Sequence, residues 1–172
     1  MGDEAVAAIT IATTIQDIVV VLFQGLSAAT AVILGNELGA GKIKRAEKYA
    51  TQFFILQFIV TIASAFVVIG IRGPLIGLYN ITEAVGRDVN ICILIFACYM
   101  PAKMFNYVNV VGVLRSGGDT KMCLFLDTSG VWCIGVPLAF LGALVWHLPI
   151  YVVYGLVMLE EVYKAVLGYI RY

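Results

Sequence analysis

The feature that most constrains the fold of this chain is a succession of long apolar stretches separated by short polar breaks. Five stretches, at about residues 5–36, 49–71, 89–114, 122–146 and 149–169, are each long enough, or nearly so, to cross a lipid bilayer. A helix of about 20 apolar residues spans the hydrocarbon core, and unbroken apolar runs lack the alternation of a transmembrane barrel. We therefore expect an all-α, multi-pass membrane protein built as a bundle of about five transmembrane helices.

The composition of the chain excludes several classes of function. Of its 172 residues 62% are apolar and only 13% are charged, with 11 basic and 11 acidic residues and a net charge of zero. A soluble domain has roughly a quarter of its residues charged, and a nucleic-acid-binding protein normally presents a basic face. The lipid bilayer is therefore an expected partner and nucleic acid is not.

No motif in the sequence indicates an enzyme, a metal site or a cofactor. The segment from Gly35 to Lys42 departs from a phosphate-binding loop at two positions. The four cysteines have neither C-x-x-C nor zinc-ligand spacing, so we interpret them as small apolar residues within the stretches; they are Cys92, Cys98, Cys123 and Cys133.

The breaks between the stretches carry turn residues and set the expected orientation. They fall at residues 39–42, 72–74, 116–119 and 147–149 and contain glycine or proline. Basic residues concentrate in the first break, around the third and in the tail, at Lys42, Lys44, Arg45, Lys48, Arg115, Lys121 and Arg171. Lysine and arginine accumulate on the cytoplasmic side. We expect a plasma (inner) membrane protein with its amino end outside and its carboxyl end cytoplasmic.

A polar stripe runs along the third stretch and centres on Lys103. Its members lie close to one helical face, at Tyr99, Lys103, Asn106, Tyr107 and Asn109. Lys103 lies about 18 Å along a helix from Arg115, too deep to reach the interface easily. Three interpretations remain: an ion pair with a carboxylate of a neighbouring helix, a binding or proton-linked group in a water-filled cavity, and exposure to lipid, which is costly.

Other polar residues supply partners for Lys103. Asp17 and Gln24 share a face of the first stretch, with Asp17 deep within it. In the last stretch the spacing of Glu160 and Lys164 predicts a local pair, which leaves Glu161 the freer partner for Lys103. We expect Asp127, near the cytoplasmic end of the fourth stretch, to have a structural role at helix ends or beside Arg115.

Two segments resemble the multidrug and toxic compound extrusion (MATE) transporters. The run from Gly35 to Gly41, followed by Ala46, is similar to the end of the second helix of a lobe in that family. The run from Gly112 to Thr120 is similar to the G-x-L-R-x-G-G-D-T loop after the fourth helix of a lobe. Within it we assign a structural role to the motif residues Leu114, Arg115, Gly117, Gly118 and Asp119.

The resemblance implies that residues 1–172 are a partial carboxyl-terminal lobe. The family has twelve helices in two lobes, and this chain resembles helices 8 to 12. It would be a fragment, a truncated product or an isolated half-lobe, lacking the amino-terminal lobe and the first helix of its own lobe. In the sodium-coupled branch an acidic residue of the tenth helix helps to bind the cation, and that position falls on Met104 here. The family's cation ligands therefore do not transfer to this chain.

The implied function is part of a cation-coupled efflux antiporter for drugs or metabolites that works by alternating access. Its expected partners are the missing lobe or a second chain, a small organic substrate, and H⁺ or Na⁺, and we expect the chain to be inactive alone. Lys103, Asn106 and Tyr107 would line the cavity, with Asp17 or Glu161 as charge partner. The alternatives are a small oligomeric membrane scaffold or pore, and a lipid-linked polysaccharide flippase of the same superfamily.

Overall fold

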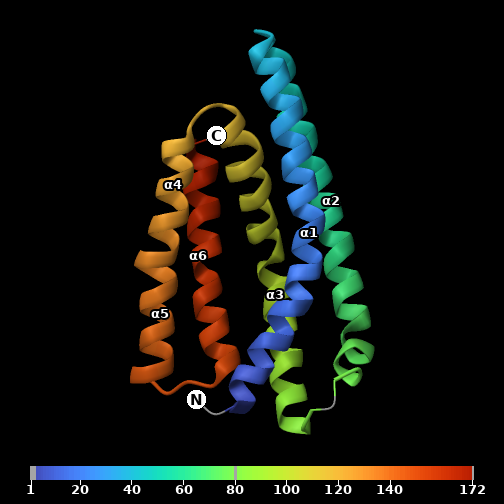
Figure 1. The fold of residues 1–172 in the computed structure, drawn as a ribbon, viewed down its shortest axis with the longest axis vertical. Coiled ribbons are helices and arrows are strands. Elements are labelled where there is room, and N and C mark those ends of the chain that lie inside the picture. Colours follow the sequence, from blue (N-terminus) through green and yellow to red (C-terminus); the bar gives the residue numbers. More distant parts are fainter. Residues whose placement is uncertain (1–2, 80, 172) are drawn as a thin grey trace.

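The computed structural model describes residues 3–79 and 81–171, which form five long helical rods (Figure 1) and contain no strand. The elements are α1 (Asp3–Gly39), α2 (Ile43–Gly77), α3 (Glu83–Asn106), η1 (Tyr107–Leu114), α4 (Thr120–Ser129), η2 (Gly130–Gly135), α5 (Val136–Phe140), η3 (Leu141–Val145) and α6 (Ile150–Arg171). The η elements are π-helical turns within otherwise α-helical rods. The third rod is therefore α3–η1, and the fourth runs from α4 to η3.

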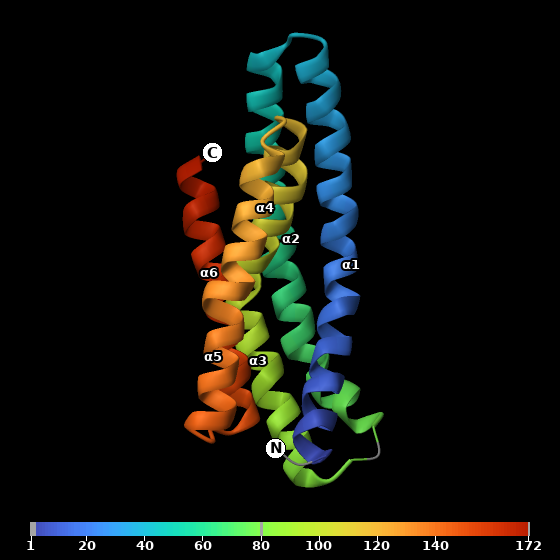
Figure 2. The same ribbon diagram turned by 60° about the vertical axis from the view of Figure 1, so that its left-hand side comes forward.

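The rods run side by side and alternate in direction, so the two chain ends lie at opposite ends of the bundle (Figure 1). The amino end shares its end of the bundle with the turns before α3 and before α6. The α1–α2 turn and the η1–α4 turn lie at the end where the chain finishes. The α1–α2 hairpin projects beyond the other rods there (Figure 2). All the basic breaks named above thus meet at one end.

Three of the four expected breaks are confirmed, and the second lies later than expected. The first and third contain Gly41 and Gly118, whose φ angles of 72° and 86° are easy only for glycine. The expected second break at residues 72–74 is wrong, because α2 continues through Pro74 to Gly77. Membrane helices tolerate an internal proline when neighbouring groups take up the freed carbonyl.

Four rods are long and apolar enough to cross a membrane: Asp3–Gly39, Ile43–Gly77, Glu83–Leu114 and Thr120–Val145. The fifth, α6, has 22 residues, or about 33 Å at the usual helical rise. It differs from the other four because Glu160, Glu161 and Lys164 interrupt its apolar run. Two of these, Glu161 and Lys164, are buried inside the bundle.

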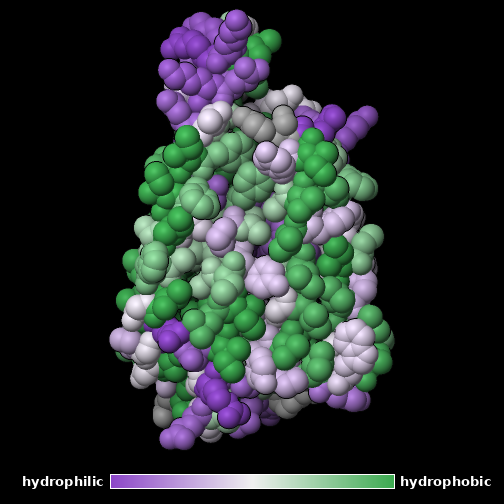
Figure 3. Space-filling model, turned by 180° about the vertical axis from the view of Figure 1, so that it is seen from behind, coloured by the Kyte–Doolittle hydropathy of each residue, from purple (hydrophilic) through white to green (hydrophobic). Residues whose placement is uncertain are grey.

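The core lies where α1, α3 and α6 meet, and the outer faces are apolar. Phe23, Met100 and Met104 are fully shielded within this cluster. Met104 is therefore a core side chain. Figure 3 shows apolar side chains over much of the outer surface, and large ones such as Phe66 and Trp132 are exposed. An apolar exterior is what a lipid-facing surface requires.

A buried ion-pair network between α3 and α6

The centre of the site is an ion pair between Lys103 of α3 and Glu161 of α6. The Lys103 Nζ donates to Glu161 Oε1 at 2.8 Å, and the two side chains are only 13% and 8% exposed. This confirms the pairing expected from the sequence and contradicts the interpretation that Lys103 faces lipid. A charge removed from water needs a close partner and further hydrogen bonds to offset its desolvation.

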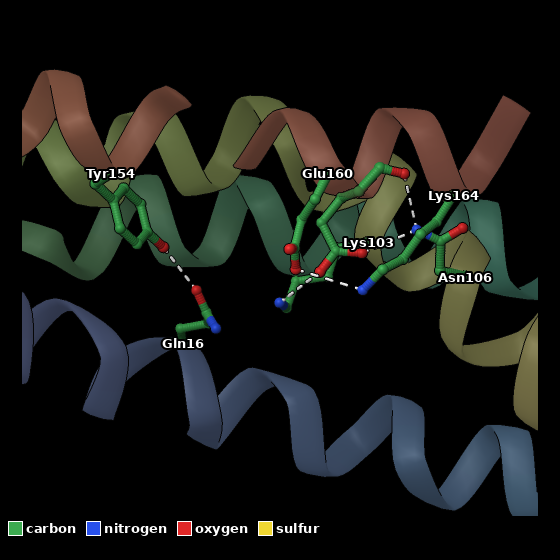
Figure 4. A network of polar contacts seen from close by, with 7 residues as sticks. Gln16, Lys103, Asn106, Tyr154, Glu160 and Lys164 are labelled. Atoms are coloured by element: carbon green, nitrogen blue, oxygen red, sulfur yellow. Dashed lines mark hydrogen bonds and ion pairs between the residues drawn. The ribbon is translucent and has the colours of Figure 1, made fainter. Parts of the chain in front are cut away.

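Asn106 supplies those further hydrogen bonds. It lies three residues after Lys103, near the end of α3, and its Nδ2 donates to Glu161 Oε2 at 2.9 Å and to the Glu161 main-chain oxygen at 2.8 Å. Both carboxylate oxygens of Glu161 therefore have a donor. The ammonium and the amide hold the Glu161 side chain in one position, and they tie α3 to α6 (Figure 4).

A second pair lies on α6 itself. Lys164 Nζ lies 3.4 Å from Glu160 Oε1, as the i, i+4 spacing predicted. Two glycines of η2, which the sequence analysis overlooked, make room for it. A Cβ added at Gly130 would collide with the Lys164 stem, and one at Gly135 would collide with the Glu160 carboxylate. The two glycines in the fourth apolar stretch were the sequence signal that could have indicated close packing against the charged side chains of the fifth.

A cavity of about 230 Å³ adjoins the two pairs. Its wall consists of Lys103, Asn106, Tyr107, Val110, Val111, Asp127, Glu161 and Lys164. Asp127 was expected to have a structural role, but its exposed side chain forms part of this wall. The cavity is therefore lined by two ammonium groups and two carboxylates. Charges of both signs therefore face one cavity.

Two residues of the polar stripe do not join the cavity wall. Asn109 is fully buried and packs against Gly168 of α6, and neither polar atom of its side chain has a hydrogen-bond partner in the described part of the chain. The wider π-helical turn of η1 changes the angular step between residues, so the α-helical period does not carry Asn109 to the face of Asn106. Tyr99 is half-buried and packs against the core.

The polar residues of α1 lie apart from the network. Asp17 and Gln24 are exposed, so Glu161, not Asp17, is the partner of Lys103. The neighbouring Gln16 instead faces inward, and its Oε1 accepts a hydrogen bond of 2.6 Å from the Tyr154 hydroxyl of α6 (Figure 4). Both side chains are buried. This bond between α1 and α6 was not predicted, because a single glutamine on a helix gives no indication of its partner.

Asp119 organises the turn at the basic end of the bundle. Its Oδ1 accepts from the Met122 N–H at 3.3 Å and so caps α4, while its Oδ2 accepts from Arg171 Nε at 2.7 Å. The hydrogen bond from Arg171, assisted by the one from Met122, lowers the pKa of the Asp119 carboxyl below its usual value. Gly118 and Asp119 of the loop motif thus lie in the turn between η1 and α4, and the hydrogen bond from Arg171 ties this turn to the end of α6.

No group of three His, Cys, Asp or Glu side chains that could hold a metal ion occurs in residues 3–79 and 81–171. All four cysteines are free; Cys92 and Cys123 are buried, and Cys98 and Cys133 are exposed. Cys123 donates to the Val110 carbonyl at 3.3 Å.

Comparison with known proteins gives matches over most of the chain. Residues 1–141 match the sequence profile of the MatE family. The Multidrug resistance protein MdtK of Yersinia pseudotuberculosis serotype O:1b (strain IP 31758) is 28% identical over 143 residues, which are 82% of this chain and 31% of that protein. The Multidrug and toxin extrusion protein 1 of Pongo abelii is 25% identical over 151 residues, which are 85% of this chain and 26% of that protein. The chain thus spans less than a third of the length of these relatives.

Proposed function

Since this chain belongs to the MatE family, we propose that it forms part of a cation-coupled multidrug efflux antiporter. A small organic molecule would leave the cell while H⁺ or Na⁺ enters. The names of the relatives, a multidrug resistance protein and a multidrug and toxin extrusion protein, support this class of substrate. The apolar rods support a place in the bilayer.

The observation that carries the proposal is the Lys103–Glu161 pair beside a cavity in the middle of an apolar bundle. Ionisable side chains at membrane depth are costly and mark ion or substrate pathways. Glu161 has an exchangeable counterion, because a proton, a sodium ion or a cationic substrate can take the place of the Lys103 ammonium. Binding and release of such a cation would loosen or tighten the contact of α3 with α6.

We propose that the bundle is one wall of a cavity that opens alternately to each side of the membrane. The other wall would come from the missing amino-terminal lobe or from a second chain. The fraction of each relative that the chain spans supports this view. We therefore expect the chain alone to be inactive in transport.

The proposed orientation places the amino end outside and the carboxyl end in the cytoplasm of a plasma (inner) membrane protein. Its support is the gathering of the basic breaks at one end of the bundle, together with the end of α6 (Figure 1). A basic end normally stays on the cytoplasmic side. A cysteine introduced at Lys44 should then react with an impermeant thiol reagent only after the membrane is opened.

A flux experiment tests the proposed function. The chain, and separately the longest protein that its gene encodes, are reconstituted into liposomes, and efflux of a cationic dye is followed under an imposed H⁺ or Na⁺ gradient. We expect flux from the longer protein alone, lost in Lys103→Ala and kept in the exposed control Lys121→Ala. Antiport by the chain alone would refute the proposal that it is only one part of a larger transporter.

The same preparation separates transport from a pore. An oligomeric pore, the alternative weighed above, would let the dye leak out even when no H⁺ or Na⁺ gradient is imposed. It would also appear as a closed homo-oligomer in native mass spectrometry. Normal flux with only a lower unfolding temperature in Lys103→Ala would make the ion pair structural.

A further inference from the structure

A groove outside the ion-pair network lies at the basic end of the bundle, between the α1–α2 hairpin and the end of η1. Its volume is about 400 Å³. The lining residues are mostly apolar and small; they are Leu34, Leu38, Ile43, Ala46, Glu47, Ala50, Val113, Ser116 and Gly117. Ala46 and Ala50 of α2 lie at the bottom of this furrow, where they are buried beside Leu34 of α1.

The groove lies near the hydrophilic end of an apolar bundle, where the hydrocarbon core of a bilayer would give way to lipid headgroups. The α1 helix has 37 residues, or about 55 Å, against a hydrocarbon core of about 30 Å. Its far end, and the hairpin tip with it, therefore pass beyond the core. The tip is strongly hydrophilic and stands on an apolar body (Figure 3), and the groove lies at this boundary.

Exposed basic residues are the sequence neighbours of two lining residues. Lys42 and Lys44 stand on either side of the lining residue Ile43, and Arg115 precedes the lining residue Ser116; all three are exposed. Glu47 is the acidic residue among the lining side chains. Arg45 instead pairs within the hairpin, since it lies 3.5 Å from the Tyr49 hydroxyl and 3.9 Å from a Glu37 oxygen. An apolar furrow with a cationic rim is complementary to an amphiphile that carries a negative head.

We propose that this groove binds an anionic phospholipid of the leaflet at the basic end. An acyl chain lies along Leu38, Ala46 and Ala50, and the phosphate contacts Lys42, Lys44 and Arg115. Glu47 accepts hydrogen bonds from headgroup hydroxyls such as those of a glycerol. Clusters of lysine and arginine just beyond a membrane helix attract anionic lipid, and the furrow adds apolar contact that a soluble anion could not use. This assignment does not depend on the transport function.

The charge of the rim is tested by native mass spectrometry of the full chain, extracted from vesicles that contain equal amounts of phosphatidylglycerol and phosphatidylcholine. We expect phosphatidylglycerol to be retained preferentially. Lys42→Gln with Lys44→Gln should reduce its retention roughly 10- to 30-fold. The matched control, Arg45→Gln with Lys48→Gln, removes the same charge from residues that do not border Ile43, and should retain the lipid. Equal losses in both variants would overturn the proposal.

The furrow is tested separately. Ala50→Phe fills it, whereas Thr51→Phe adds the same ring to the exposed side of α2. We expect only the first to release the lipid, with helix content by circular dichroism unchanged in both. If Ala50→Phe misfolds, the comparison of the two double charge variants decides whether the lipid site exists. An excess of glycerol phosphate should not displace the lipid; displacement, or equal retention of both lipids, would overturn the proposal.

Discussion

Removing one partner of the Lys103–Glu161 pair should cost more than removing both. At the observed 2.8 Å, two unit charges attract by about 6 kcal/mol at an effective dielectric constant of about 20. Desolvation of the two charges offsets much of this attraction, so the net contribution of the pair to the free energy of unfolding is small. A single variant keeps the desolvation cost of the remaining charge and loses the attraction, which typically costs about 3–5 kcal/mol.

The two single variants should differ in a way that the hydrogen bonds explain. In Lys103→Met the Glu161 carboxylate keeps the amide of Asn106 as a donor. In Glu161→Gln the buried ammonium of Lys103 has lost its carboxylate, so this variant should be the less stable. The double variant should return to within about 1–2 kcal/mol of the natural chain, because a matched uncharged pair replaces a buried ion pair with little change.

The assay is unfolding by titration with dodecyl sulfate in mixed micelles, followed by tryptophan fluorescence. A double-mutant cycle then gives the coupling free energy directly. Lys121→Met is the control, since it removes one exposed positive charge and should change stability by no more than about 0.5 kcal/mol. Single variants that cost less than about 1 kcal/mol, and a double variant equal to their sum, would show that water solvates both charges and would refute the reasoning.

Three further predictions concern the contacts between rods. Gly112→Ala should cost about 1–3 kcal/mol, because its Cβ would lie 3.0 Å from Thr30 Cβ. Tyr154→Phe should cost about 0.6–1.7 kcal/mol through the lost bond to α1; both costs are measured in the same micelles. Since the pKa of Asp119 is lowered, its contribution is present above the unfolded pKa of about 3.9 and is lost as pH falls through the folded pKa. The protection factor against hydrogen exchange at the first turn of α4, which corrects for the intrinsic pH dependence of exchange, should therefore fall in acid, and Asp119→Asn should remove this dependence.

Each of these has a matched control. Gly25→Ala adds the same methyl group where nothing lies within 4 Å, so it should leave stability unchanged or slightly raised. Tyr163→Phe removes a longer bond of 3.4 Å to Ser129 and should cost less than Tyr154→Phe. The Asp119 reasoning fails if the asparagine variant shows the same acid response as the natural chain.

Local chemistry predicts the rods well, because apolar length and turn residues are properties of the sequence alone. The all-α class was correct, and so were the turns around Gly41 and Gly118. The end of α2 was not, since Pro74 breaks a soluble helix but is tolerated in the last turns of a membrane rod. The Lys103–Glu161 contact was also predictable, because the spacing of Glu160 and Lys164 left one free carboxylate on α6.

Rotation about the rod axes was the part that the sequence did not reveal. Whether Asp17 or Gln16 faces the bundle depends on how α1 packs against α3 and α6, and the two residues are adjacent. Asn109 follows the α-helical period in the sequence but lies on a π-helical turn, which changes its direction. Asp127 lines the cavity, and Gly130 and Gly135 of the same rod leave space for the charged side chains of α6.

The charges of α6 have a consequence for how the protein is made. A lysine at the centre of a membrane helix adds about 2.5–3.5 kcal/mol to the free energy of insertion by the translocon, and α6 carries Lys164 together with two glutamates. The ammonium that neutralises Glu161 and the amide that donates hydrogen bonds to it belong to α3, which leaves the ribosome earlier. We therefore expect an ordered biogenesis, in which α6 enters the membrane readily only after α3 has supplied Lys103 and Asn106. A defect at either residue should appear first as misinserted, rapidly degraded protein.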